Sequence, residues 1–170
     1  MRLLIIEFII LFFGLPVFVY FEFVRIPKIL TLLIITAYCF FILWKQKALR
    51  NVDSTVSKKA YLKKILLRFI PLGIIILLIA VLASPQTLFS FPRQRPGIWL
   101  IVMFFYPILS AFPQELIYRS FFFHRYKSIF TSNLAMILMS TVTFGFLHII
   151  FFYFLAVILS LFGGYLFSKT

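Results

Sequence analysis

The sequence predicts an all-α fold, a polytopic membrane bundle of about six transmembrane helices. Of its 170 residues, 64% are hydrophobic and 12% are charged, whereas soluble domains are about 45–50% apolar and about 25% charged. Phenylalanine alone occurs 25 times, which is more apolar surface than a water-soluble fold of this size can bury. The apolar residues also form long runs, close to the roughly 20 residues that a helix needs to cross a bilayer.

The first two transmembrane helices are expected over residues 3–24 and 29–44, joined by a short turn. The first run is too long for a secretory signal and lacks a small-residue cleavage site, so we expect a retained membrane helix. Residues 45–64 follow, with seven Lys and Arg and the single acid Asp53. This composition predicts a solvated loop, part of which could form an amphipathic helix on the lipid headgroups.

The third transmembrane helix is expected over residues 65–83. Pro71 and Gly73 lie inside it and should bend it, as such residues commonly do in membrane helices. Residues 84–97 contain three prolines and therefore predict an exposed loop.

The last three spans lie in the C-terminal part of the sequence. Residues 98–112 form a fourth, short apolar run, in which Pro107 predicts a kink. Pro113 is expected to restart a helix in its first turn, where the missing N–H does no harm. Residues 133–150 and 151–167 are the fifth and sixth expected spans, although no clear turn signal separates them.

The distribution of Lys and Arg predicts the orientation. Residues 45–64 hold seven cations, whereas residues 25–28 and 84–97 hold two each, so the positive-inside rule places 45–64 in the cytoplasm together with both termini. The cations lie between apolar segments, so the net charge of +13 indicates attraction to anionic lipid and not a nucleic-acid partner. We therefore expect an integral protein of the plasma membrane, with the lipid bilayer as its partner.

Glu115 is the most informative polar residue of the sequence. The chain has only four acidic residues: Glu7, Glu22, Asp53 and Glu115. An ionisable group at bilayer depth costs about 2.5–3.5 kcal/mol, so it usually has a function. On a helix Glu115 shares a face with Arg119, and Gln114 lies about 100° round from that face. The pair can be a structural salt bridge or part of a functional site, and the spacing alone fits both.

His148 is the second candidate, at the end of the run Phe144-Gly145-Phe146-Leu147-His148. A lone histidine on an apolar helix is more often a packing residue, and Gly145 allows another helix to approach. If His148 and Glu115 meet, the two could hold and activate a water molecule, with the carboxylate as general base. No HExxH motif is present, and one glutamate with one membrane histidine is too small a ligand set for zinc.

Three further groups of polar or small residues favour structural roles. Glu7 is close enough to the headgroups to snorkel or to pair with a cation. His124 lies near Arg125 and Lys127, and this group of basic residues predicts the solvated end of a helix. A stripe of small residues with four-residue spacing predicts helix packing. The stripe consists of Ala156, Ser160 and Gly164.

Together these residues resemble the CPBP family of intramembrane proteases (CAAX protease and bacteriocin-processing, or Abi), relatives of the type II CAAX prenyl endopeptidase. The family motifs are EExxxR, then FxxxH, then a final HxxxN or HxxxD. Gln114 to Arg119 resembles the first motif with Gln at its first position, and Phe144 to His148 matches the second. Residues 163–170 resemble the segment that leads into the last family helix. The diagnostic core is residues 112–148.

The resemblance implies one integral-membrane domain over residues 1–170, with a family-like core from about 65 to 170 and the final family helix missing. It also implies that a protein or peptide substrate is hydrolysed by a glutamate-activated water. Glu115 and His148 would position this water and Arg119 would hold the carboxylate, while the family's last His and Asn would stabilise the oxyanion. No cofactor is implied, although older descriptions of the family invoke a divalent metal and that option stays open.

Two departures from the family pattern leave an alternative. The first Glu of the motif usually takes the base role, and Gln114 cannot accept a proton at neutral pH. The sequence also ends at Thr170 before any HxxxN, as a C-terminally truncated gene model would. The chain is therefore either an endopeptidase that uses Glu115 as the base, or a non-catalytic membrane scaffold or immunity protein that retains the fold. A transporter is weaker, because no inverted repeat supports it.

Overall fold

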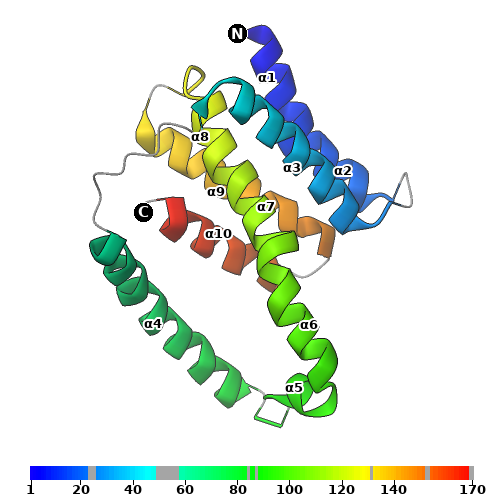
Figure 1. Ribbon diagram of the computed structural model, residues 1–170, viewed down its shortest axis with the longest axis vertical. Coiled ribbons are helices and arrows are strands. Elements are labelled where there is room, and N and C mark those ends of the chain that lie inside the picture. The colour runs from blue at the N-terminus through cyan, green and yellow to red at the C-terminus, as the bar shows by residue number, and fades with distance from the viewer. Residues whose placement is uncertain are drawn as a thin grey trace. The chain divides into compact units, whose positions relative to one another are not determined.

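The computed structural model describes residues 1–22, 26–48, 58–83, 85–86, 88–130, 132–151 and 154–168. All regular structure within these residues is helical, which confirms the all-α prediction (Figure 1). The chain divides into two compact units, Met1–Leu49 with Ile108–Thr170, and Arg50–Pro107. The expectation of one domain over residues 1–170 stays a prediction.

The larger unit begins with a helical run that contains one π-helical turn. Its parts are α1 (Arg2–Ile9), the π-helical turn η1 (Ile10–Gly14) and α2 (Leu15–Tyr20), followed by α3 (Lys28–Lys45). Both runs agree with the first two expected spans. Residues 23–25, which are the end of the first expected span and the first residue of the expected turn, lie outside the described residues.

The described residues of the smaller unit form α4 (Lys58–Ala83), α5 (Ser90–Gln94) and α6 (Pro96–Tyr106). Residues 49–57, the middle of the expected polar loop 45–64, lie outside the described residues, whereas residues 58–64 of that expected loop belong to α4. Residues 84–97 were expected to be an exposed loop; most of those described are exposed, but the loop conformation was wrong in part, because α5 lies within it and α6 begins at Pro96. Pro92 is the third residue of α5, and a proline in the first turn removes an N–H that has no intrahelical partner.

Helical backbone continues through Pro113, so the prediction that this residue restarts a helix was wrong. The segments in this region are η3 (Pro107–Ala111), α7 (Phe112–Glu115), η4 (Leu116–Phe121) and α8 (Phe122–Arg125). Ala111 has right-handed helical dihedrals (φ −65°, ψ −49°), so the chain does not leave the helix before Pro113. The π-helical turns η3 and η4 flank Pro113, and such local adjustments let a membrane helix accommodate proline.

The C-terminal helices α9 (Asn133–Leu147) and α10 (Phe154–Ser168) pack against each other. Between them the 3₁₀ turn η5 (His148–Phe151) supplies the break that the sequence did not mark. A Cβ atom added to Gly145 would lie 2.5 Å from Leu161 Cδ2, and one added to Gly164 would lie 3.4 Å from Thr141 Cα. The prediction that the small-residue stripe packs against a helix is therefore confirmed at Gly164.

Four helices of the described residues are long and apolar enough to cross a membrane. They are Arg2–Tyr20, Lys28–Lys45, Pro96–Arg125 and Asn133–Phe151. Two shorter apolar helices, Ile70–Leu82 and Ala156–Tyr165, lie within the third and sixth expected spans. The fourth expected run is not separate, because it is part of the 30-residue helix Pro96–Arg125.

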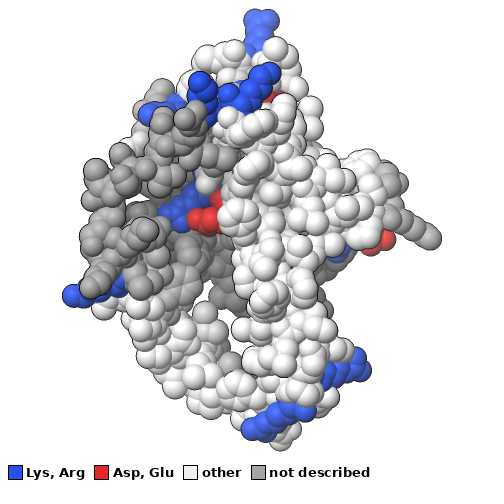
Figure 2. Space-filling model, in the orientation of Figure 1, with Lys and Arg blue, Asp and Glu red and all other residues white. Residues whose placement is uncertain are grey.

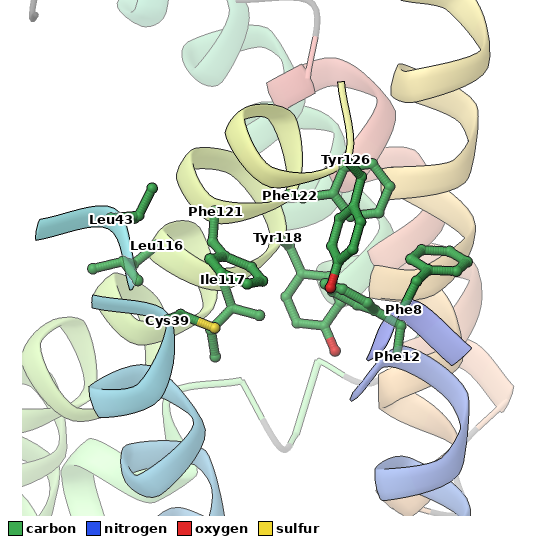
Figure 3. Close-up of a cluster of buried hydrophobic side chains, with 10 residues drawn as sticks. All are labelled: Phe8, Phe12, Cys39, Leu43, Leu116, Ile117, Tyr118, Phe121, Phe122 and Tyr126. Carbon is green, nitrogen blue, oxygen red and sulfur yellow. The ribbon is translucent and has the colours of Figure 1, made fainter. Parts of the chain in front are cut away.

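The core of the larger unit is an aromatic cluster built by three helical runs (Figure 3). Its buried residues are Phe8, Phe12, Cys39, Leu43, Leu116, Ile117, Tyr118, Phe121, Phe122 and Tyr126. Outside this cluster many large apolar side chains are exposed, and the face in Figure 2 carries wide areas without charge. Exposed apolar surface on this scale fits a protein whose solvent is lipid. The chain is an integral membrane protein.

Candidate active site

Glu115 and Arg119 form the ion pair that their spacing predicts. Glu115 is the last residue of α7 and Arg119 lies in η4, and the Nη1 atom of Arg119 donates a hydrogen bond to Oε1 of Glu115. The Glu115 side chain is 50% exposed and that of Arg119 is 28% exposed. Within the described part of the chain, no second residue forms a hydrogen bond with this carboxylate. The guanidinium keeps the carboxylate oriented.

Gln114 occupies the position next to this pair and turns back along its own helix. It is half-buried, and its Nε2 atom donates to Oγ of Ser110, one turn earlier, at 2.9 Å. The amide is neutral, so it can donate and accept hydrogen bonds but cannot act as a base. Ser110 was not singled out from the sequence.

His148 is the first residue of η5 and is half-buried. Its Nδ1 atom lies 2.9 Å from the backbone oxygen of Phe144. A carbonyl oxygen can only accept, so Nδ1 carries the hydrogen, and Nε2 of the neutral ring keeps its lone pair. The rings of Phe144 and Phe151 lie beside the imidazole, with centroids at 4.9 Å and 5.9 Å. This arrangement presents Nε2 as a hydrogen-bond acceptor.

The two motif segments are in contact with each other. Tyr118 of the first segment packs edge-on against Phe144 of the second, with ring centroids 5.3 Å apart. The hydroxyl of the buried Ser140 also donates to the backbone oxygen of Tyr118 at 2.6 Å. Glu115 and His148 themselves are not joined by a hydrogen bond in the described part of the chain. Their convergence on one water therefore stays a prediction, whereas the contact between η4 and α9 is observed.

Ser140 fixes this contact, although the sequence reading did not single it out. In a π-helical turn such as η4 the regular hydrogen-bond ladder is interrupted, and the Ser140 hydroxyl satisfies a carbonyl of that turn. Ser140, Phe144 and His148 are spaced four residues apart and lie on one face of their helix. Extending the FxxxH motif by one turn toward the N-terminus would have identified this serine.

A second polar cluster joins the first helix to the end of α8. Arg125 donates from Nε to Glu7 Oε1 at 3.1 Å and from Nη2 to Glu7 Oε2 at 2.8 Å. The hydroxyl of Tyr126 donates to Glu7 Oε1 at 3.2 Å. Burial and the nearby Glu7 carboxylate raise the pKa of Tyr126, so its hydroxyl stays protonated. The structural role predicted for Glu7 therefore takes the form of a bidentate ion pair.

His124 lies at the same end of α8 and is exposed, as predicted. Its Nε2 atom lies 2.9 Å from Oε1 of Gln46, which follows α3. The histidine is therefore more than a solvated helix end, because it also links α8 to the end of α3.

A divalent metal ion would need several ligating side chains close together. Among the residues that the structure describes, no three His, Cys, Asp or Glu side chains lie close enough together to hold a metal ion. The glutamate and histidine of the motifs thus do not make a set of the size that zinc needs.

One known protein family matches the C-terminal part of the chain. Residues 96–170 match the family model described as Type II CAAX prenyl endopeptidase Rce1-like. The matched segment contains Glu115, Arg119 and His148, and the family is one of proteases. The comparisons with curated proteins and with solved structures find no match. Over residues 96–170, the chain is therefore similar to the Rce1-like family of type II CAAX prenyl endopeptidases, and this match supports the resemblance that the sequence motifs indicate.

Proposed function

We propose that this protein is an intramembrane endopeptidase in which Glu115 and His148 activate the attacking water. The supporting observation is that both motif segments lie inside the family match and pack together through Tyr118 and Phe144. A shared surface between these segments is what a common water site would require.

The proposed chemistry follows from the hydrogen bonds of each group. Arg119 occupies Oε1 of Glu115, so Oε2 takes a proton from the water while Nε2 of His148 accepts the other O–H. The resulting hydroxide attacks the scissile carbonyl carbon and forms a tetrahedral intermediate. Glu115 then returns its proton to the leaving amine as the C–N bond breaks. Gln114 stays neutral throughout and contributes as a hydrogen-bonding group beside the base.

The test is peptide cleavage by the protein in proteoliposomes. Two fluorogenic peptides are compared: one ends in a farnesylated CAAX sequence, and the other is identical but unprenylated. Both are used because no described residue indicates whether the substrate carries a prenyl group. Glu115→Gln and His148→Ala should each lower the cleavage rate by about 10²–10⁴-fold, the usual contribution of general acid–base catalysis. Glu22→Gln is the matched control, since Glu22 is an exposed carboxylate outside both motifs. Cleavage at the wild-type rate by either motif variant would reject the proposal.

Gln114 supports a second candidate function, a non-catalytic scaffold or immunity protein that keeps the family fold. Its amide stands where the family motif has its first glutamate and bonds Ser110, so it already has a purely structural partner. The variant Gln114→Glu separates the two functions. A silent wild type together with an active Gln114→Glu variant favours the scaffold, whereas an active wild type favours the enzyme.

The position in the cell is part of the proposal. We keep the expectation of a plasma-membrane protein with both termini in the cytoplasm, which is supported by the seven cations of residues 45–64. A cysteine placed at Asp53 in a Cys39→Ala background reports the side of this loop. Labelling by an impermeant maleimide in intact cells would contradict the orientation.

A further inference from the structure

Lys28 links the N-terminal helices to the turn that carries His148. It is the first residue of α3 and lies outside the segment that matches the family. Its Nζ atom donates to the backbone oxygen of Ile150 at 2.8 Å, across 122 residues of sequence. The same ammonium lies 5.5 Å from the centroid of the Phe151 ring. One side chain thus holds both the backbone and an aromatic ring of η5.

The 3₁₀ turn that Lys28 holds begins at His148. Its four residues run from His148 to Phe151, and the Phe151 ring lies 5.9 Å from the imidazole. Carbonyl groups at the C-terminal end of a helix lack intrahelical partners, and a cation there is favourable. Without the ammonium, the Ile150 carbonyl loses this donor and Phe151 loses its cation, so the turn beneath the imidazole is free to change.

We propose that Lys28 is a positioning residue for His148, which fixes η5 and thereby the tautomer and direction of the imidazole. The effect of Lys28 on catalysis rests on the proposed function, whereas its effect on the tautomer and direction of the His148 imidazole does not. In the sequence reading Lys28 was only one cation of a short turn. The contact across 122 residues gives it this role.

The direct test is NMR of the full-length protein labelled with ¹⁵N-histidine. The chain has two histidines, His124 and His148, so the spectrum contains its own control. In the wild type, His148 should show the pattern of a single Nδ1–H tautomer. In Lys28→Met this pattern should be lost toward tautomer averaging, while the His124 signals stay unchanged because the Gln46 contact lies at the other end of α3.

Two further variants make the test specific to Lys28. Lys28→Arg should retain the wild-type His148 pattern, since it keeps a cation that can donate to Ile150. Lys45→Met removes an exposed cation from the last position of α3 and should leave both histidines unchanged. Unchanged His148 signals in Lys28→Met would overturn the proposal.

A folding defect is detected separately. If Lys28→Met also changes the His124 signals, the variant has a wider folding defect. The proposal is then tested with Phe151→Leu, which retains the hydrogen bond from Lys28 to the Ile150 backbone oxygen. That variant must shift His148 alone, and an unshifted His148 there also overturns the proposal. In the cleavage assay Lys28→Met should lower kcat with KM unchanged. Should His148→Ala retain full activity, the proposed function fails while the NMR result still decides the role of Lys28.

Discussion

The substitution Gly145→Ala tests how closely α9 and α10 approach beside the FxxxH motif. A Cβ atom on Gly145 would lie 2.5 Å from Cδ2 and 2.7 Å from Cγ of Leu161. Ordinary contact begins at 3.4 Å, so 3.4 − 2.5 gives a required shift of about 0.9 Å in Leu161 or in a whole helix. Overpacking of this kind costs about 1–3 kcal/mol, and alanine recovers up to about 1 kcal/mol of helix propensity. We expect a net loss of up to about 2 kcal/mol.

Two other glycines of the larger unit form a matched series. A Cβ on Gly164 would lie 3.3 Å from Phe144 Cδ1, which requires a shift of only a few tenths of an ångström. A Cβ on Gly14 would meet Ile9 O at an ordinary 3.7 Å. Gly164→Ala should therefore cost less than Gly145→Ala, and Gly14→Ala should be neutral or slightly stabilising.

The assay is equilibrium unfolding of the purified protein in mixed micelles, followed by far-UV circular dichroism. Leu161→Ala removes the atoms that the new methyl group would meet, so it should suppress the cost of Gly145→Ala in a double-mutant cycle. The reasoning is refuted if Gly145→Ala is as stable as Gly14→Ala, or if the two changes at 145 and 161 are additive.

Two further predictions concern contacts between distant segments, both measured as free energies of unfolding in the same micelles. Glu7→Gln removes the charge partner of Arg125 in a pair whose side chains are 19% and 24% exposed, and should cost about 1.5–3 kcal/mol. A cycle with Arg125→Met should show coupling, and purely additive losses would contradict the ion pair. Ser140→Ala leaves the Tyr118 carbonyl without its hydroxyl donor and should cost about 1–3 kcal/mol. The control is Thr36→Val, which removes only a hydrogen bond to the carbonyl four residues earlier in its own helix and should be nearly neutral. Equal losses of unfolding free energy in the two variants would contradict the role of the Ser140 hydroxyl.

Features that depend on local sequence were predictable. Apolar runs located the helices, because crossing a bilayer requires length and hydrophobicity that are visible residue by residue. The Glu115–Arg119 pair was also predictable, since residues four apart in a helix are neighbours. The glycine of the FxxxH run indicated a close helix contact, which Leu161 provides.

Features that depend on tertiary structure were not predictable. Glu7 meets Arg125 across 118 residues, and no local pattern records which cation a membrane glutamate will find. The continuous helix through Pro113 was missed because proline propensity reflects water-exposed helices, whereas π-helical turns flank this proline. From the sequence, Lys28 was only a cation of a short turn. Its hydrogen-bond acceptor is the backbone oxygen of Ile150, and the order of the amino acids does not show which backbone atom a lysine will contact.

The central claim is that a water molecule activated by Glu115 and His148 hydrolyses a peptide bond within the membrane. The most direct measurement is the single-turnover cleavage rate of the fluorogenic peptides in proteoliposomes, with the products identified by mass spectrometry. We expect cleavage by the wild type and by Glu22→Gln, and a rate at least about 100-fold lower for both Glu115→Gln and His148→Ala. Cleavage of the same bond at the wild-type rate by either motif variant would contradict it.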